Sequence, residues 1–469
     1  MIWKIRIVPI AVALWTTALA LLSAPESRSA TPPSLRVESR GTDLRLAWDP
    51  VNGVVTYTLE RAEALVPATW QTITANLTAT EWSGPLPTTG TGFYRLRVVE
   101  LPTRGAVLTN LHLKTYSQAD ISALLLRYPV PGITARAVDA WKIVYQTLDA
   151  QGQPTYASAL VVVPAATDRA LPILSYQHGT ITEREDVPSR LNDEADIGLL
   201  LAAAGYIAVL PDYLGLGDSP GFHPYHHAKS EATAVVDAVR GARNSLSARN
   251  VQWNNQLFLT GYSHGGHSTL AAHREFELLH TNEFTITASA PAAGAYDLSG
   301  TTTADLLSTR VPPNPYYTAY LLAAYVDVYG LAPDLASLLR APYDTTLPPL
   351  LDGRHGGSEI NAAMPSRPTD IFKPDYLQAF RDDPNHPLRV ALRDNDLHTG
   401  WVPKSRTKLY HCRGDQDVVF GNSQVAFDTF KAAGAVSVEL IDPFSLANHS
   451  TCALLALPQA KLWFDSLKQ

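Results

Sequence analysis

Short runs in which apolar and polar residues alternate fill residues 34–100. The stretch LRVESRGTDLRLAWDP (35–50) shows this alternation, as do TYTLERA (56–62) and GFYRLRVVE (92–100), and turns rich in Gly, Pro and Asn separate the runs. A period of two places alternate side chains on opposite faces of a half-buried strand. The pattern therefore predicts an all-β sandwich domain at residues 31–101.

A different pattern begins near Ala106. Strand-like apolar runs now alternate with helix-length stretches, of which Glu194–Ala204 and Glu231–Leu246 are the clearest. Continuous apolar strands separated by helices are typical of a mostly parallel sheet that helices cover on both faces. We therefore expect an α/β domain at residues 102–469. Its predicted strands include Ala159–Pro164, Leu171–Gln177, Tyr206–Pro211 and Gln256–Gly261.

The region at about 294–400 interrupts this rhythm. It contains helix-prone pieces such as YYTAYLLAAYVDVYG (316–330) and DLASLL (334–339), separated by proline-rich loops. An insertion of this size between two strands of a regular sheet predicts a helical cap. Most of its aromatic side chains are expected to pack in the cap itself, and the alternative is that they line a substrate pocket.

The first 30 residues have the anatomy of a secretory signal peptide. Lys4 and Arg6 precede an apolar run over residues 7–22, and Ala24 and Ala30 offer two cleavage points. The alternative, a membrane anchor, needs about 20 apolar residues. We therefore expect an exported protein. The formal net charge of −7 gives no general footprint for nucleic acid.

The stretch TGYSHGGHST (260–269) contains the pattern G-x-S-x-G, with Ser263 at its centre. A predicted strand precedes it and a predicted helix follows it. Glycines two residues before and after the serine remove side chains that would collide in a sharp strand-to-helix turn. The five residues alone are a weak signal, but their context predicts that Ser263 is a nucleophile. A serine in a purely structural turn is the alternative.

A nucleophilic serine needs a base and a group that orients the base. The last of the 14 histidines, His449, follows a strand-like run and precedes the final helix. Two acids, Asp415 and Asp417, directly follow the strand-like KLYHC (408–412). The chain order Ser, Asp, His is that of α/β-hydrolases. His449 is therefore the candidate base, and either aspartate is a candidate acid.

An oxyanion hole needs two backbone N–H groups. One is expected from His264, the residue after the nucleophile. The other is expected from the loop after the predicted strand Leu171–Gln177, with Thr180 as the preferred donor and Gly179 as the alternative. A simple turn glycine is the remaining interpretation of this loop.

A metal or organic cofactor is not expected. The histidines His223, His226 and His227 lie close together in the sequence, but no paired carboxylate or cysteine spacing accompanies them. The sequence also lacks a phosphate-binding glycine loop and a dinucleotide motif.

The chain has only two cysteines, Cys412 and Cys452. An even, low cysteine count in an exported chain favours one disulfide, and two buried free thiols are the alternative. Cys412 lies three residues before Asp415, and Cys452 lies three residues after His449. The predicted bridge would therefore join the loop of the candidate acid to that of the candidate base.

Several motifs resemble the secretory lipase family of α/β-hydrolases: SYQHGT (175–180), LPDYLGLGDSPG (210–221), GYSHGGHS (261–268) and the Asp415/His449 pair. The likeness covers roughly residues 105–469. It implies a carboxylic ester hydrolase with a helical cap, whose nucleophile, acid and base are Ser263, Asp415 and His449. Relatives often place a valine three residues after the acid and an Asn-Ser pair at the next helix. Val418 and Asn422-Ser423 keep that spacing, which favours Asp415 over Asp417. Val419 departs from the proline that many relatives carry.

The amino-terminal domain resembles a fibronectin type III domain. Trp48, Tyr57 and Tyr94 match core positions of that fold, and they are expected in the core rather than against a ligand. The resemblance implies no particular partner for this domain.

The combined prediction is a secreted serine carboxylesterase or lipase. Its substrate would be a small-molecule or lipid ester. Contact of the protein with a lipid–water interface is a further prediction that goes with a lipid substrate. Two alternatives stay open at this point. One is a serine peptidase of the same fold, and the other is a non-catalytic surface-binding protein that works through its amino-terminal domain.

Overall fold

The computed structural model describes residues 8–10, 35–40, 43–48, 55–64, 69–77, 80–85, 92–100 and 103–469. The chain divides into two compact units, Met1–Thr103 and Arg104–Gln469. The predicted signal peptide lies outside the described residues except for Val8–Ile10, which form the short strand β1. None of the helices in the described ranges combines the length and the apolar character that crossing a bilayer requires.

The amino-terminal unit contains two antiparallel sheets, with strand orders β1-β7-β4-β5 and β2-β3-β6. Trp48, Tyr57 and Tyr94 are each only 2% exposed and share one core, as expected. The rings of Trp48 and Tyr57 meet edge to face, with centroids 5.3 Å apart. The strands after β1 are β2 (Leu35–Arg40), β3 (Asp43–Trp48), β4 (Val55–Ala62), β5 (Gln71–Leu77), β6 (Glu81–Pro85) and β7 (Gly92–Glu100).

The second unit is built on a nine-stranded sheet with the order β16-β15-β14-β13-β11-β12-β10-β9-β8. The six strands β12, β11, β13, β14, β15 and β16, in this spatial order, pair in parallel. At the other side of the sheet, β10 pairs antiparallel with both β12 and β9, and β9 pairs antiparallel with β8. The bounds are β8 (Val107–Tyr116), β9 (Val138–Leu148), β10 (Pro154–Pro164), β11 (Leu171–Gln177), β12 (Ile207–Pro211), β13 (Trp253–Tyr262), β14 (Ile286–Ala292), β15 (Arg406–Tyr410) and β16 (Val438–Ile441).

The predicted strand Ala159–Pro164 falls in β10, which runs antiparallel to both of its neighbours. This part of β10 is buried on both faces. A continuous apolar sequence indicates that a strand is buried on both faces, but it does not indicate whether the neighbouring strands are parallel or antiparallel. The sequence pattern therefore could not predict the antiparallel direction of β10.

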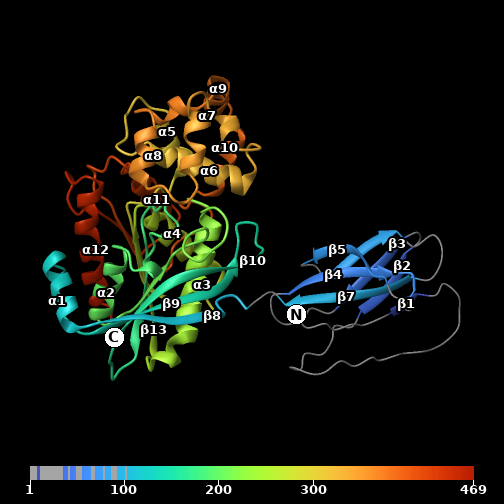
Figure 1. Ribbon diagram of the computed structural model, residues 1–469, viewed down its shortest axis with the longest axis horizontal. Helices are drawn as coiled ribbons and strands as arrows, with labels where there is room; N and C mark the ends of the chain where they lie inside the picture. Colours follow the sequence, from blue (N-terminus) through green and yellow to red (C-terminus); the bar gives the residue numbers. More distant parts are fainter. Residues whose placement is uncertain are drawn as a thin grey trace. The chain divides into compact units, whose positions relative to one another are not determined.

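Helices cover both faces of the sheet (Figure 1). Helices α2 and α12 pack on one face, and α3 and α4 pack on the other. Alternate residues of β11 supply the two cores, because Leu174 and Tyr176 face α2 and α12 whereas Ile173 faces α3. The helical bounds are α1 (Gln118–Arg127), η1 (Pro188–Arg190), α2 (Ala195–Ala203), α3 (Ala228–Ser245), η2 (Leu246–Arg249), α4 (His264–Leu279), α11 (Gly421–Ala432) and α12 (His449–Asp465).

A helical cap lies between β14 and β15 and has a core of its own (Figure 1). Tyr320 and Tyr325 are buried there, and their hydroxyls donate to the backbone carbonyls of Ile181 and His226 in the sheet domain. The cap elements are η3 (Leu298–Thr302), α5 (Thr303–Leu306), α6 (Tyr316–Tyr329), η4 (Ala336–Leu338), α7 (Tyr343–Thr346), η5 (Pro348–Leu350), α8 (Gly357–Ala363), η6 (Pro368–Ile371), α9 (Pro374–Asp382) and α10 (Pro387–Asp394).

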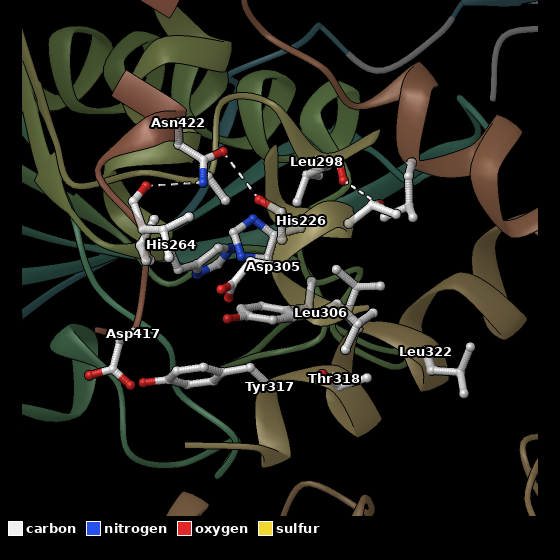
Figure 2. Close-up of a pocket in the computed structure, with 18 of the residues that line it drawn as sticks. His226, His264, Leu298, Asp305, Leu306, Tyr317, Thr318, Leu322, Asp417 and Asn422 are labelled. Carbon is white, nitrogen blue, oxygen red and sulfur yellow. Dashed lines mark hydrogen bonds between the residues drawn. The ribbon is translucent and has the colours of Figure 1, made fainter. Parts of the chain in front are cut away.

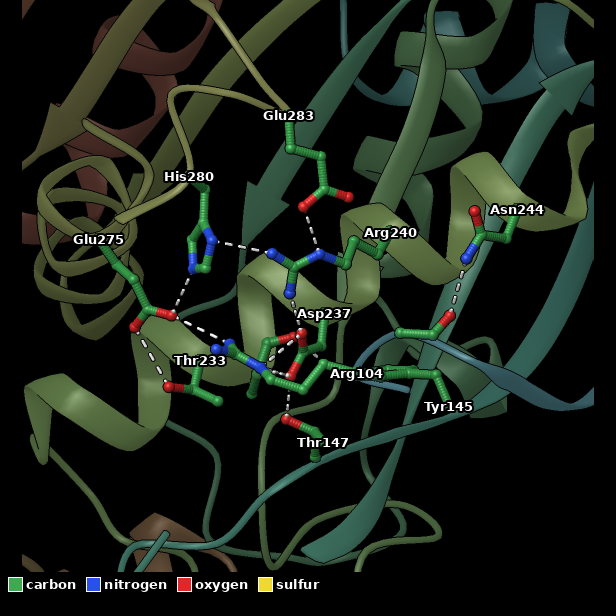
Figure 3. A network of polar contacts seen from close by, with 12 residues as sticks. Arg104, Tyr145, Thr147, Thr233, Asp237, Arg240, Asn244, Glu275, His280 and Glu283 are labelled. Atoms are coloured by element: carbon green, nitrogen blue, oxygen red, sulfur yellow. Dashed lines mark hydrogen bonds and ion pairs between the residues drawn. The ribbon is translucent and has the colours of Figure 1, made fainter. Parts of the chain in front are cut away.

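A buried ionic network fastens the start of this unit to α3 and α4 (Figure 3). Asp237 on α3 has no exposed side-chain surface. Its carboxylate accepts from Arg104 Nε at 2.9 Å, from Arg240 Nη1 at 2.6 Å and from Thr147 Oγ1 at 2.8 Å. Arg104 also donates to Glu275 of α4 at 3.0 Å. Removal of one partner from such a network would leave an uncompensated buried charge, which is destabilising.

Candidate active site

Ser263 occupies a strained turn between β13 and α4. Its φ of 61° and ψ of −123° lie in a region that residues other than glycine rarely adopt. A Cβ on Gly265 would lie 1.9 Å from the carbonyl oxygen of Gln177, and a Cβ on Gly261 would lie 2.4 Å from that of Gly265. No other residue type fits either glycine position without movement of the backbone. The turn thus holds Ser263 at the carboxyl end of β13.

Asp415 and His449 come together from two separate loops. Asp415 follows β15, and His449 is the first residue of α12. The Nδ1 of His449 lies 2.6 Å from Asp415 Oδ2, and it is the donor because an ionised carboxylate only accepts. The backbone N–H groups of Asp417 and Val418 donate to the other Asp415 oxygen. Asp417 instead accepts from Asn314 Nδ2 at 2.7 Å. The structure therefore brings Asp415, and not Asp417, to His449.

A second histidine approaches the same carboxylate. His411 Nε2 lies 3.3 Å from Asp415 Oδ2, and His411 Nδ1 lies 2.7 Å from Ser423 Oγ. Burial acts to raise the pKa of Asp415, but hydrogen bonds and charge from His411 and His449 outweigh it, so this pKa lies below its ordinary value. The sequence prediction did not single out His411. Its position at the end of β15, four residues before Asp415, was the only signal.

Cys412 and Cys452 form the predicted disulfide. Their Cα atoms lie 5.9 Å apart, and 40 positions separate them in the sequence. The bridge joins the loop that carries Asp415 to the first turn of α12, which carries His449. It therefore restricts the relative motion of the two residues that make the 2.6 Å contact.

The loop His178-Gly179-Thr180 lies beside this turn and is held from two sides. Thr180 Oγ1 and the hydroxyl of Tyr225 share a hydrogen bond of 2.8 Å. The hydroxyl of Tyr213 donates to the carbonyl oxygen of His178 at 3.2 Å. Burial lowers the pKa of His178 to about 4, so this imidazole is neutral at pH 7. The loop is thus fixed by neutral and internally paired groups.

The backbone and the side chain of His264 make different contacts. As the first residue of α4, it has a backbone N–H with no acceptor inside the helix. Its Nε2 lies 2.7 Å from Glu231 Oε1, whereas His267 Nδ1 and Ser268 Oγ lie 2.8 and 2.7 Å from Glu231 Oε2. Burial acts to raise the pKa of Glu231, but its two histidine partners outweigh this and lower it.

Glu231 is also the residue that could complete a metal site. The side-chain ligand atoms of His226, Glu231 and His264 lie within 4.8 Å of one another, and all three residues are buried. Both Glu231 oxygens already accept hydrogen bonds from protein groups, whereas the buried Nδ1 atoms of His226 and His264 have no hydrogen-bond partner. The sequence prediction treated Glu231 only as the start of a helix and did not connect it with the three histidines at 223, 226 and 227.

A small cavity of about 120 Å³ lies between Ser263 and the cap (Figure 2). Aliphatic side chains such as Leu306 and Leu322 form much of its wall. Figure 2 shows Tyr317 and Asp417 with their polar ends directed toward one another at one side. Tyr317 therefore lines the cavity, unlike Tyr320 and Tyr325, which pack in the cap core.

Comparison with known proteins supports the chemistry of this site. The family model described as secretory lipase matches residues 193–277. The rice cell wall degrading esterase LipA from Xanthomonas oryzae is 28% identical, with a TM-score of 0.67 over 78% of this chain and 96% of that one. A candidate hydrolase from Legionella pneumophila is 27% identical, with a TM-score of 0.70 over 77% of this chain and 98% of that one.

A more distant structure shares the fold alone. Candida antarctica lipase A in its closed state is 17% identical, with a TM-score of 0.58 over 78% of this chain and 82% of that one. No curated protein gave a match. The sheet and its cap, the secretory lipase match and the two solved relatives agree with one another, and the chain is a carboxylic ester hydrolase with an α/β-hydrolase fold.

Proposed function

We propose that this protein is a secreted serine carboxylesterase or lipase that uses Ser263 as nucleophile, His449 as base and Asp415 as the orienting acid. The observation that carries the proposal is the 2.6 Å contact between His449 Nδ1 and Asp415 Oδ2, because it leaves the opposite ring nitrogen unprotonated. An unprotonated Nε2 can take a proton from a serine hydroxyl.

In the first half of the reaction, His449 Nε2 takes the Ser263 proton while Ser263 Oγ bonds to the ester carbonyl carbon. The negative charge on the carbonyl oxygen is then stabilised by the backbone N–H groups of His264 and Thr180. Gly179 is the alternative to Thr180 as the second donor. Asp415 stabilises the imidazolium.

In the second half, the carbonyl–oxygen bond to the alcohol breaks, and the alcohol leaves with the proton from His449. Water then gives a proton to His449 and attacks the acyl-enzyme, which releases the carboxylic acid and restores the Ser263 hydroxyl. Every proton that leaves the serine or the water passes through His449, so no further group is needed to balance the reaction.

The setting of the enzyme is also part of the proposal. The sequence anatomy of residues 1–30 and the secretory lipase match support export. The likeness to a rice cell wall degrading esterase supports a cell-wall ester as one class of substrate, next to lipids. The amino-terminal unit, with its two antiparallel sheets, is proposed as a fibronectin type III-like domain.

The test is the hydrolysis of p-nitrophenyl esters by purified variants. Ser263→Ala and Asp415→Asn are each expected to lower kcat by about 10⁴-fold or more. The first variant lacks the nucleophile, and the second no longer holds His449 in the tautomer that has an unprotonated Nε2. Asp417→Asn is the matched control and should change kcat by no more than a few-fold. Full activity of Ser263→Ala would refute the proposal, and a loss with Asp417→Asn but not Asp415→Asn would refute the acid assignment. A dipeptide substrate tests the peptidase alternative in parallel.

A further inference from the structure

A second and larger cavity of about 640 Å³ also reaches Ser263. We call it the α2–α12 cavity, because its walls come from these two helices and the sheet face beneath them. Its lining includes Ser263 and Gly179 at the carboxyl ends of the strands. It also includes Leu454, which is 68% exposed, and the exposed Arg127, so the cavity extends from the nucleophile to solvent.

The walls of the α2–α12 cavity are mainly aliphatic and aromatic. Leu174 comes from β11, Leu200 from α2, and Leu457 and Phe464 from α12. Pro458, which also lines the cavity, lies inside α12. A proline inside a helix cannot donate to the carbonyl four residues earlier and bends the helix.

Two of the charged side chains that line the cavity, Glu194 and Lys461, are already paired with protein groups. Glu194 accepts from the hydroxyl of Tyr176 at 2.8 Å. Lys461 Nζ donates to the carbonyl of Pro131 at 2.9 Å and lies 2.7 Å from Asp465. Burial also raises the pKa of Glu194 and so disfavours its charge. An occupant would therefore meet mainly apolar surface beside Glu194 and Lys461, while Asp193 is exposed.

We infer that the α2–α12 cavity binds a hydrocarbon chain of the substrate ester, and that the 120 Å³ cavity under the cap, which Ser263 also lines, takes the smaller side of the ester. This inference rests on the proposed function of Ser263. The argument is continuity: a chain bonded to the carbonyl under attack can run from Ser263 directly into the larger cavity. The preferred substrate is therefore an ester with one long aliphatic side and one short side.

Two substrate series distinguish which side of the ester is long. The first varies the acyl chain of p-nitrophenyl esters, and the second varies the alkyl chain of acetate esters followed by pH-stat. In one of the two series, kcat/KM of the wild-type protein should rise about fourfold for each added methylene over the first several carbons, because each buried methylene contributes about 0.8 kcal/mol. Chain-length independence in both series would overturn the inference.

Variants locate the chain. Leu200→Trp fills the buried wall, and Leu454→Trp places the same ring at the exposed rim, where folding tolerates it. Both should lower the ratio of kcat/KM for long-chain over short-chain esters at least tenfold. Leu278→Trp, at a position on α4 that is 55% exposed on the other face, is the control and should leave the ratio unchanged. Ratios equal to wild type in both cavity variants would overturn the inference.

Binding of cis-parinaric acid, followed by its fluorescence, separates this inference from the proposed function. The wild-type protein should bind the fatty acid, and Leu200→Trp should weaken this binding at least tenfold while Leu278→Trp does not. If this pattern holds but Ser263→Ala keeps full esterase activity, the proposed nucleophile is wrong and the cavity assignment survives. If Ser263→Ala is inactive but the fatty acid binds Leu200→Trp as well as wild type, only the cavity assignment fails.

Discussion

The disulfide between Cys412 and Cys452 offers a perturbation that acts on stability and on the candidate site together. The change is the double variant Cys412→Ser/Cys452→Ser, which removes the bridge without leaving a reactive thiol. The bridge closes a loop of 40 positions. In the chain-entropy model such a loop removes about 13 cal/mol/K from the unfolded state, which corresponds to about 4 kcal/mol at 25 °C.

That free energy converts to a shift of the melting temperature. The second unit runs from Arg104 to Gln469, which is 366 residues (469 less 103). At about 2.1 cal/mol/K for each residue, its unfolding entropy is about 0.77 kcal/mol/K, so the loss of about 4 kcal/mol lowers Tm by roughly 5 °C. Circular dichroism on heating measures the shift of Tm. The wild-type protein treated with a phosphine reductant also lacks the bridge, so it tests the same shift without a substitution.

The same variant should lose activity in a specific way. The bridge ties the loop of Asp415 to the turn of His449, and neither sulfur lines the cavities beside Ser263. Because the geometry of the base would loosen while substrate contacts persist, kcat on a p-nitrophenyl ester should fall several-fold with little change in KM. An unchanged Tm together with an unchanged kcat would refute the reasoning, and a change confined to KM would refute the positioning role.

Further predictions concern three buried carboxylates. Glu231→Ala leaves two histidines and a serine hydroxyl without their acceptor, and it should lower the free energy of unfolding by about 3–5 kcal/mol in urea titrations. Asp237→Ala should cost a similar amount, because two arginines lose their shared partner, and a denaturation midpoint equal to wild type would contradict this. Burial acts to raise the pKa of Glu277, but His273 and two backbone donors hold this pKa at about 2, below its ordinary value of 4.5. The stabilisation is therefore complete above pH 4.5 and is lost as the pH falls toward 2. The stability advantage of wild type over Glu277→Gln should shrink across that window, and a constant difference would refute this assignment.

The sequence could predict the elements and residues whose signals are local. Ser263 could be proposed as the nucleophile because two glycines, a strand and a helix surround it within a few residues, and Gly265 has no room for a Cβ. Asp415 and His449 could be proposed because chain order and loop position restrict the choice. The preference over Asp417 came from the spacing of Val418, and the 2.6 Å contact agrees with it.

Other features have no local signature. Glu231 hydrogen-bonds His264, which lies 33 positions later in the sequence. The helix-forming sequence around Glu231 contains no signal that predicts this partner. The antiparallel direction of β10 is hidden because a strand buried on both faces has the same composition in either direction. The α2–α12 cavity is space left by the packing of α2, α12 and the sheet, and no single sequence segment encodes it.

The central claim, that Ser263 is the activated nucleophile, is tested most directly by covalent labelling with a fluorophosphonate probe, followed by intact-mass measurement and peptide mapping. We predict one probe for each chain, bonded to Ser263, with no labelling of Ser263→Ala and at least a hundredfold slower labelling of His449→Ala. A probe bonded to a different residue, or an unlabelled wild-type protein that still hydrolyses esters, would contradict the account.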